Sequence, residues 1–79
     1  MDPKTEAMTK ALLEQLRIER AAADLSYVEI ARRLEMGEQS VRRYFKGERD
    51  IPMPILVGLV QVLGIDLDTL VQRAAARLA

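Results

Sequence analysis

A group of polar and basic side chains between residues 38 and 49 has the most specific chemistry in this 79-residue sequence. On a helix that advances about 100° per residue, Gln39, Arg43 and Lys46 share one face, and Val41 lies on the opposite face. Arginine pairs bidentately with the acceptors of guanine, and glutamine pairs with the donor and acceptor of adenine. These residue types at this spacing indicate a helix that contacts base edges in the major groove of DNA.

Basic side chains beside that face suit the phosphates of a DNA backbone. Lys46, Arg42 and Arg49 lie on this flank. Contacts to phosphates fix the register of a protein on the duplex, whereas contacts to base edges carry the sequence information. The sequence therefore predicts two kinds of contact from one short segment.

Two short amphipathic helices separated by a tight turn must position these side chains. Residues 35–37 between them are too few for anything but a sharp reversal, and Gly37 supplies backbone freedom for it. Apolar residues recur at helical intervals in both segments, so we expect the two helices to share one apolar wedge. The wedge residues are Leu25, Ile30, Ala31 and Leu34 from the first helix and Val41, Tyr44 and Phe45 from the second.

A longer helix is predicted before this pair. Asp2 and Pro3 are suited to its first turn, and it extends to about residue 22 or 23. Ser26 then caps the next helix, with Glu29 completing the capping-box pattern. The core-facing stripe of the first helix is predicted to comprise Met8, Leu12, Leu16 and Ala23.

Two more helices are predicted after residue 51, which makes the fold an all-α, five-helix bundle. One spans residues 52–63, with proline in its first turn and Gly64 ending it. The other spans about residues 67–78 and begins after Asp66 as its N-cap. No repeat or long linker divides the chain, so we expect residues 1–79 to form a single domain.

Residues 25–71 resemble, without a gap, the phage repressor and Cro type of helix-turn-helix domain, also called the XRE family. The resemblance implies a lambda-repressor-like bundle with its helix-turn-helix at about residues 26–46. It also implies a sequence-specific transcriptional regulator, a repressor of the phage, plasmid or bacterial type. The residues that carry the resemblance are Leu25, Ser26, Glu29, Ala31, Leu34, Val41, Arg43, Gly47, Arg49, Leu59, Leu63, Gly64, Leu67, Asp68 and Leu70.

The chain departs from the family pattern at the turn and at two other positions. Glu35 stands where the family usually has glycine, and Gly37 stands where a serine or threonine usually caps the second helix of the motif. Tyr27 replaces a frequent glutamine that holds a phosphate. Phe45 replaces a glutamate that pairs with an arginine at the position of Arg20, so we expect apolar packing there instead of an ion pair.

Together, the residue types and the resemblance give two sets of candidate contacts to double-stranded DNA. The candidate base-reading residues are Gln39, Arg43, Arg42 and Ser40. The candidate phosphate-binding residues are Tyr27, Lys46, Arg49 and Arg33. For Arg32 and Arg33 two interpretations stay open, because they either contact DNA or balance Glu29 and Glu35.

The charge of the chain is polarised, although its net value is zero. Residues 32–49 hold six basic and three acidic side chains, a net charge of +3, which leaves −3 for the remainder. So modest an excess predicts weak non-specific affinity for a lone monomer, and therefore a homodimer on an inverted repeat. The resemblance implies dimerisation through the last helix, because the family often dimerises there. The candidate dimerisation residues are Val71, Ala75 and Leu78. Alternatively, these three residues complete the monomer core.

The composition also excludes several functions. Without cysteine or histidine there is no disulfide and no common zinc-site spacing. The usual nucleophile–base pairs are missing too, so we expect neither a cofactor nor a metal, and no enzyme. The apolar run 51–65 is shorter than the roughly 20 residues that a bilayer requires, and we expect no signal peptide before it. We therefore expect a cytoplasmic protein with no membrane segment and no small-molecule substrate.

A second function fits the same fold. The chain could be a protein-interaction module, such as an antitoxin or an antirepressor, that binds its target through the fifth helix. Zero net charge and the weakened turn favour this alternative. Phosphate contacts weaken steeply with salt and an apolar protein interface does not, so a salt titration separates the two.

Overall fold

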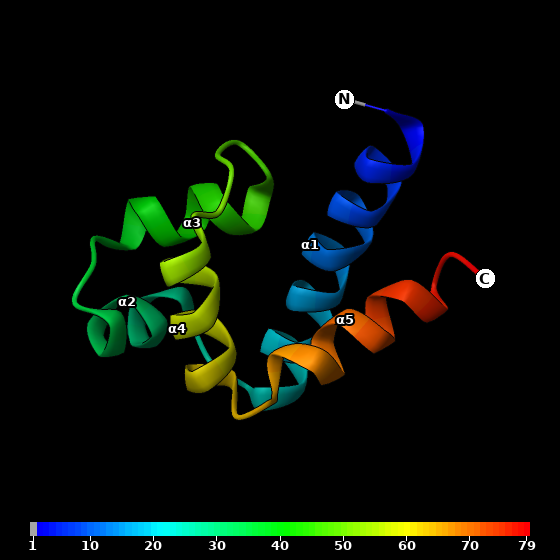
Figure 1. The fold of residues 1–79 in the computed structure, drawn as a ribbon. Coiled ribbons are helices and arrows are strands. Elements are labelled where there is room, and N and C mark those ends of the chain that lie inside the picture. The colour runs from blue at the N-terminus through cyan, green and yellow to red at the C-terminus, as the bar shows by residue number, and fades with distance from the viewer. Residues whose placement is uncertain (1) are drawn as a thin grey trace.

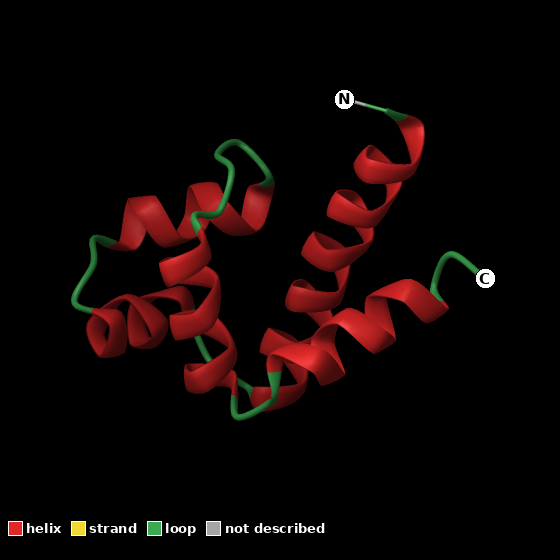
Figure 2. Cartoon of the chain, in the orientation of Figure 1, coloured by secondary structure: helices red, strands yellow, loops and turns green. Residues whose placement is uncertain are grey.

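The computed structural model describes residues 2–79 as five helices, with α1 and α5 packed together beside a cluster of α2, α3 and α4 (Figure 1). No strand occurs in this part of the chain (Figure 2). The helices are α1 (Pro3–Ala23), α2 (Tyr27–Leu34), α3 (Glu38–Lys46), α4 (Met53–Leu63) and α5 (Leu67–Ala76). The predicted all-α, five-helix fold is confirmed.

Capping side chains determine where the first two helices begin. Asp2 accepts a hydrogen bond from the backbone N–H of Thr5 at 2.9 Å, and Ser26 accepts one from Glu29 at 3.1 Å. The capping box is only half formed, because the carboxylate of Glu29 binds two arginines instead of the backbone of Ser26. Asp66 occupies the N-cap position of α5 as predicted, but its side chain makes no capping hydrogen bond.

Glycine ends two of the helices, and two predicted boundaries shift slightly. Gly47 and Gly64 close α3 and α4 with φ of 79° and 77°, the left-handed region that glycine adopts without strain. Helix α4 begins at Met53, with Pro52 as its N-cap. Helix α5 ends at Ala76, because the chain turns there through hydrogen bonds from the N–H groups of residues 77–79.

The core joins all five helices through one apolar cluster. The wedge predicted between α2 and α3 is confirmed, since Ile30, Val41 and Phe45 are at most 1% exposed. Leu16, Leu59 and Leu70 bring α1, α4 and α5 onto the same cluster. Two predicted core residues are wrong. Met8 is only half-buried and lies outside the apolar cluster, and Ala23 is exposed, because it ends α1 in a stretch, residues 21–24, that no other helix covers.

A glycine allows α2 and α4 to approach closely. A Cβ atom added at Gly58 would lie 2.9 Å from a methyl carbon of Leu34. Since real Cβ contacts are not so short, a larger residue at this position would require the Leu34 side chain to shift, and glycine avoids that. The helix-turn-helix pair therefore has a fixed support behind it.

No single helix in residues 2–79 is long and apolar enough to span a membrane. Helices α4 and α5 reach the necessary length and hydropathy only when taken together, and they meet at an angle of 93°. The three most buried side chains of α4 are those of Leu59, Val60 and Leu63.

Candidate nucleic-acid interface

Helix α3 presents an apolar face to the core and a polar face to the outside. Val41, Tyr44 and Phe45 are buried, with Tyr44 9% exposed. Gln39, Arg43 and Lys46 are all exposed. The structure thus brings together on one free helix face the residues that the sequence assigns there.

The turn that presents α3 has two of the departures noted in the sequence. Glu35 adopts φ 54°, so a non-glycine residue sits in the left-handed region that closes α2. Gly37 is the N-cap of α3, and no side chain caps the first N–H groups of that helix. The prediction that Gly37 supplies the backbone freedom of the turn is wrong, because its φ is −73° and Glu35 takes the left-handed position instead. The turn is still a sharp reversal, with less favourable residues at both positions.

Carboxylates pair with the basic side chains on either side of the exposed face. Arg32 and Arg33 donate from Nε to Glu29 at 3.1 and 3.0 Å. The hydrogen bonds from Arg32, and then the one from Arg33, lower the pKa of Glu29 below its ordinary value. Of the two interpretations left open for this arginine pair, the structure favours charge balance, with Glu29 and not Glu35 as the partner.

Arg42 has two partners that fix its direction. Its Nε donates to Oε2 of Glu38 at 2.6 Å, one turn earlier on the same helix. Its guanidinium carbon lies 5.0 Å from the ring centroid of Tyr27, the first residue of α2. The ion pair and the cation–π contact together restrict the side chain to the flank of α3 that faces α2.

Three basic side chains near α3 are left without such partners. Arg43, Lys46 and Arg49 make no ion pair and no side-chain hydrogen bond with any residue in 2–79. All three are exposed, so their charges face solvent. Each of them can engage a phosphate or a base edge without breaking a contact within the protein.

The aromatic cluster behind this surface was only partly foreseen. Phe45 is 1% exposed and packs against Tyr27, with ring centroids 5.3 Å apart, in line with the apolar packing expected in place of an ion pair. Arg20 lies over the Tyr27 ring at 4.6 Å and donates to the backbone oxygen of Leu25, while its own Nε is buried without a partner. Arg17 donates to the backbone oxygen of Phe45 at 2.6 Å.

No sequence signal indicates the role of Arg17, because it lies 28 residues before its partner and binds a backbone oxygen rather than a side chain. For Arg20 there was a signal, namely that Phe45 cannot form the family's ion pair. Both arginines tie α1 to the helix-turn-helix from behind. No group of three or more Asp or Glu side chains in residues 2–79 is arranged to hold a metal ion.

Comparison with known proteins agrees with this geometry. Residues 11–78 match the family model described as a helix-turn-helix domain, which covers most of the chain. No curated protein and no solved structure matches this chain. The chain belongs to the helix-turn-helix domain family, and it has the arrangement of two helices and a tight turn through which this motif binds DNA.

Proposed function

We propose that this protein is a sequence-specific regulator of transcription of the XRE type that inserts α3 into the major groove. The supporting observation is the distribution of ion pairs around that helix. Arg43 and Lys46 face solvent without a partner in residues 2–79, while Arg32, Arg33 and Arg42 are held by Glu29 and Glu38. Bound to an operator, such a protein represses by occluding the promoter.

The exposed residues of α3 divide into readers and positioners. Gln39 and Arg43 have the donors and acceptors that distinguish base pairs in the major groove. Lys46 and Arg49 lie at the end of α3 and in the loop after it, where their charges suit the phosphates bordering the groove. Ser40 is partly buried on the flank opposite Arg42 and has a hydroxyl for a marginal contact.

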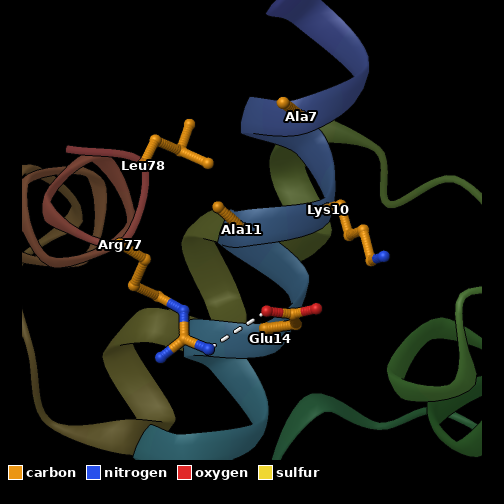
Figure 3. A pocket seen from close by; sticks show the side chains of 6 residues that line it. All are labelled: Ala7, Lys10, Ala11, Glu14, Arg77 and Leu78. Carbon is orange, nitrogen blue, oxygen red and sulfur yellow. Dashed lines mark hydrogen bonds and ion pairs between the residues drawn. The ribbon is translucent and has the colours of Figure 1, made fainter.

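We further propose that two copies bind an inverted repeat, with their α3 helices roughly 34 Å apart. Val71, Ala75 and Leu78 are all exposed, so they do not complete the monomer core. Leu78 borders a hollow of about 240 Å³ whose walls include Ala7, Ala11 and the Arg77–Glu14 ion pair (Figure 3). Burying Val71 and Leu78 against a second copy would remove two large apolar side chains from water.

Sedimentation of the protein with and without operator DNA tests the dimer. Val71→Asp places a charge in the proposed interface, and Val71 is 39% exposed, so the fold is expected to tolerate it. We expect the variant to bind the operator as a single copy and with lower affinity. Val57→Asp is the control, because Val57 is a valine of matching exposure, 38%, on α4. A wild type that always binds one copy per site contradicts the dimer.

The alternative of a protein-interaction module rests on the same exposed side chains of α5, Val71 and Leu78. Salt dependence distinguishes the two functions. Each phosphate contacted should add about 0.9 to the slope of log affinity against log salt, whereas an apolar interface adds little. The assay is binding to a random-sequence duplex between about 50 and 200 mM salt, the range over which phosphate contacts lose most affinity.

In this assay, Lys46→Ala should reduce the slope by about 0.9, as expected for one lost phosphate contact. Lys4→Ala is the matched control, because Lys4 is an exposed lysine in the first turn of α1. A folded wild-type protein that binds no duplex at the lowest salt contradicts the proposed function. It would direct attention to a protein partner for α5.

A further inference from the structure

We propose that Arg42 is a phosphate clamp rather than a base reader, and that Glu38 and the ring of Tyr27 are the residues that position it. The inference rests on the proposed DNA-binding function and assigns a role within that site. It starts from the two contacts of Arg42, since no other charged side chain of α3 has two such partners in residues 2–79.

Arg42 keeps most of its hydrogen-bond donors free within residues 2–79. A guanidinium carries five N–H donors, and Glu38 occupies only the one on Nε. The four N–H donors on the two terminal nitrogens make no hydrogen bond within residues 2–79. They form the planar fork that binds the oxygens of a phosphate bidentately. Arg42 is therefore both held and available.

The Arg42 side chain points in a different direction from that of Arg43. Arg42 is about 100° away from Arg43 around the axis of α3, so the two arginines do not share the outward face. The contact with Tyr27 draws the guanidinium towards the start of α2. When α3 lies in a groove, its outward face meets base edges and its flanks meet the sugar-phosphate walls. The position of Arg42 on the flank thus favours phosphate.

The Tyr27 ring is itself held by neighbouring side chains. Tyr27 packs against Phe45, whose side chain is 1% exposed, and Arg20 lies over the same ring while binding the backbone of Leu25. The ring is therefore fixed by the core before DNA arrives. A guanidinium stacked on a fixed ring loses less side-chain freedom on binding than a free one. Here the ring, not the hydroxyl, makes the contribution of Tyr27 to affinity.

Binding to a random-sequence duplex tests the clamp without knowledge of the operator, because phosphate contacts do not depend on sequence. We expect Arg42→Ala to weaken binding several-fold and to reduce the salt slope by about 0.9. Tyr27→Phe keeps the ring and should retain wild-type affinity. Tyr27→Leu should weaken binding, but should have no further effect once Arg42 is alanine, since the two act as one unit.

Three results would each overturn the proposal. One is an unchanged affinity and salt slope for Arg42→Ala on random duplex; a second is a loss for Tyr27→Phe as large as for Tyr27→Leu. The third is additive effects in the double variant. Thermal melts show whether each variant is folded. If Tyr27→Leu does not fold, Arg42→Ala still tests the clamp, because the Arg42 side chain is 39% exposed and its loss should leave the fold intact. If the wild type binds no duplex, the proposed function itself fails.

Discussion

Arg73 on α5 donates from Nη1 to both carboxylate oxygens of Glu19 on α1, at 2.8 Å each. Gln15, one turn earlier on α1, donates to the same carboxylate at 2.7 Å. Glu19 is only 7% exposed, so this network is a buried charged contact between α1 and α5. The hydrogen bond from Arg73, followed by that from Gln15, lowers the pKa of Glu19 below its ordinary value of 4.5.

This lowered pKa predicts how stability depends on pH. As pH falls, the unfolded chain takes up a proton on Glu19 before the folded chain does. The stabilisation by this carboxylate is therefore present above pH 4.5 and is lost as pH falls through the lowered pKa. We expect Glu19→Gln to cost about 1–3 kcal/mol of unfolding free energy at neutral pH.

Thermal melts or urea titrations of wild type and variant between neutral pH and pH 2 would measure this difference. The gap between the two proteins should close in acid. Comparing the two removes the contributions of Asp2 and Glu29, whose pKa values are lowered as well. Glu14→Gln is the control, because its ion pair with Arg77 is exposed and should contribute under about 1 kcal/mol. A gap that stays constant with pH would refute the assignment.

Val41 anchors the recognition helix in the core. Its side chain is 1% exposed and belongs to the apolar cluster shared by all five helices. Val41→Ala should lower the unfolding free energy by about 1–3 kcal/mol, through lost burial and the cavity left behind. Val28→Ala, at a 54% exposed position on α2, should change it by less than about 0.5 kcal/mol. Equal losses in urea titrations would contradict the packing described.

Glu35 is held at φ 54°, a conformation that costs a non-glycine residue about 1–2 kcal/mol. Part of the gain from Glu35→Gly is offset by the greater freedom of glycine in the unfolded chain. We therefore expect a net stabilisation of about 0.5–1 kcal/mol by thermal melts. Asp24→Gly, at the same φ, should gain less, because aspartate tolerates this region better. A destabilised Glu35→Gly variant would show that the side chain makes a compensating contact.

Glu38 holds Arg42 through a hydrogen bond, but its negative charge repels the phosphates of DNA. One substitution separates these two effects. Glu38→Gln keeps an oxygen for Arg42 but removes a negative charge that repels phosphates, so affinity for all duplexes should rise about two- to five-fold at low salt. It should also remove the favourable interaction of this charge with the N-terminus of α3. The free energy of unfolding, followed by thermal melts, should therefore fall by about 0.3–1 kcal/mol. Weaker binding confined to one base pair would instead make Glu38 a reader of cytosine.

Periodicity and end signals were enough to predict the five helices. Apolar residues at helical spacing placed the wedge between α2 and α3, and Ser26 and Gly64 marked helix ends. Such signals are local, so they are present in the sequence itself. Ala23 fits the same pattern but is exposed, because periodicity does not show how far along α1 the neighbouring helices extend.

Contacts between distant residues could not be predicted in the same way. Arg73 meets Glu19 across 54 residues, and Arg17 meets the backbone of Phe45 across 28. By charge alone, Arg73 could pair with any of several acidic residues. Only the packing of the helices selects Glu19. The same holds for Arg42, whose contact with Tyr27 depends on the angle between α2 and α3. Its flank position was visible in the sequence, but its direction was not.

The most direct test of the account is selection of binding sites from a randomised duplex pool at about 0.15 M salt, where non-specific contacts are weak. Arg43→Ala and Lys46→Ala would be selected in parallel with the wild type. We expect the wild type to enrich an inverted repeat. Arg43→Ala should relax the preference at one base pair at a cost of about 1–3 kcal/mol, and Lys46→Ala should weaken all sites alike. No enrichment by a folded wild-type protein would contradict the account.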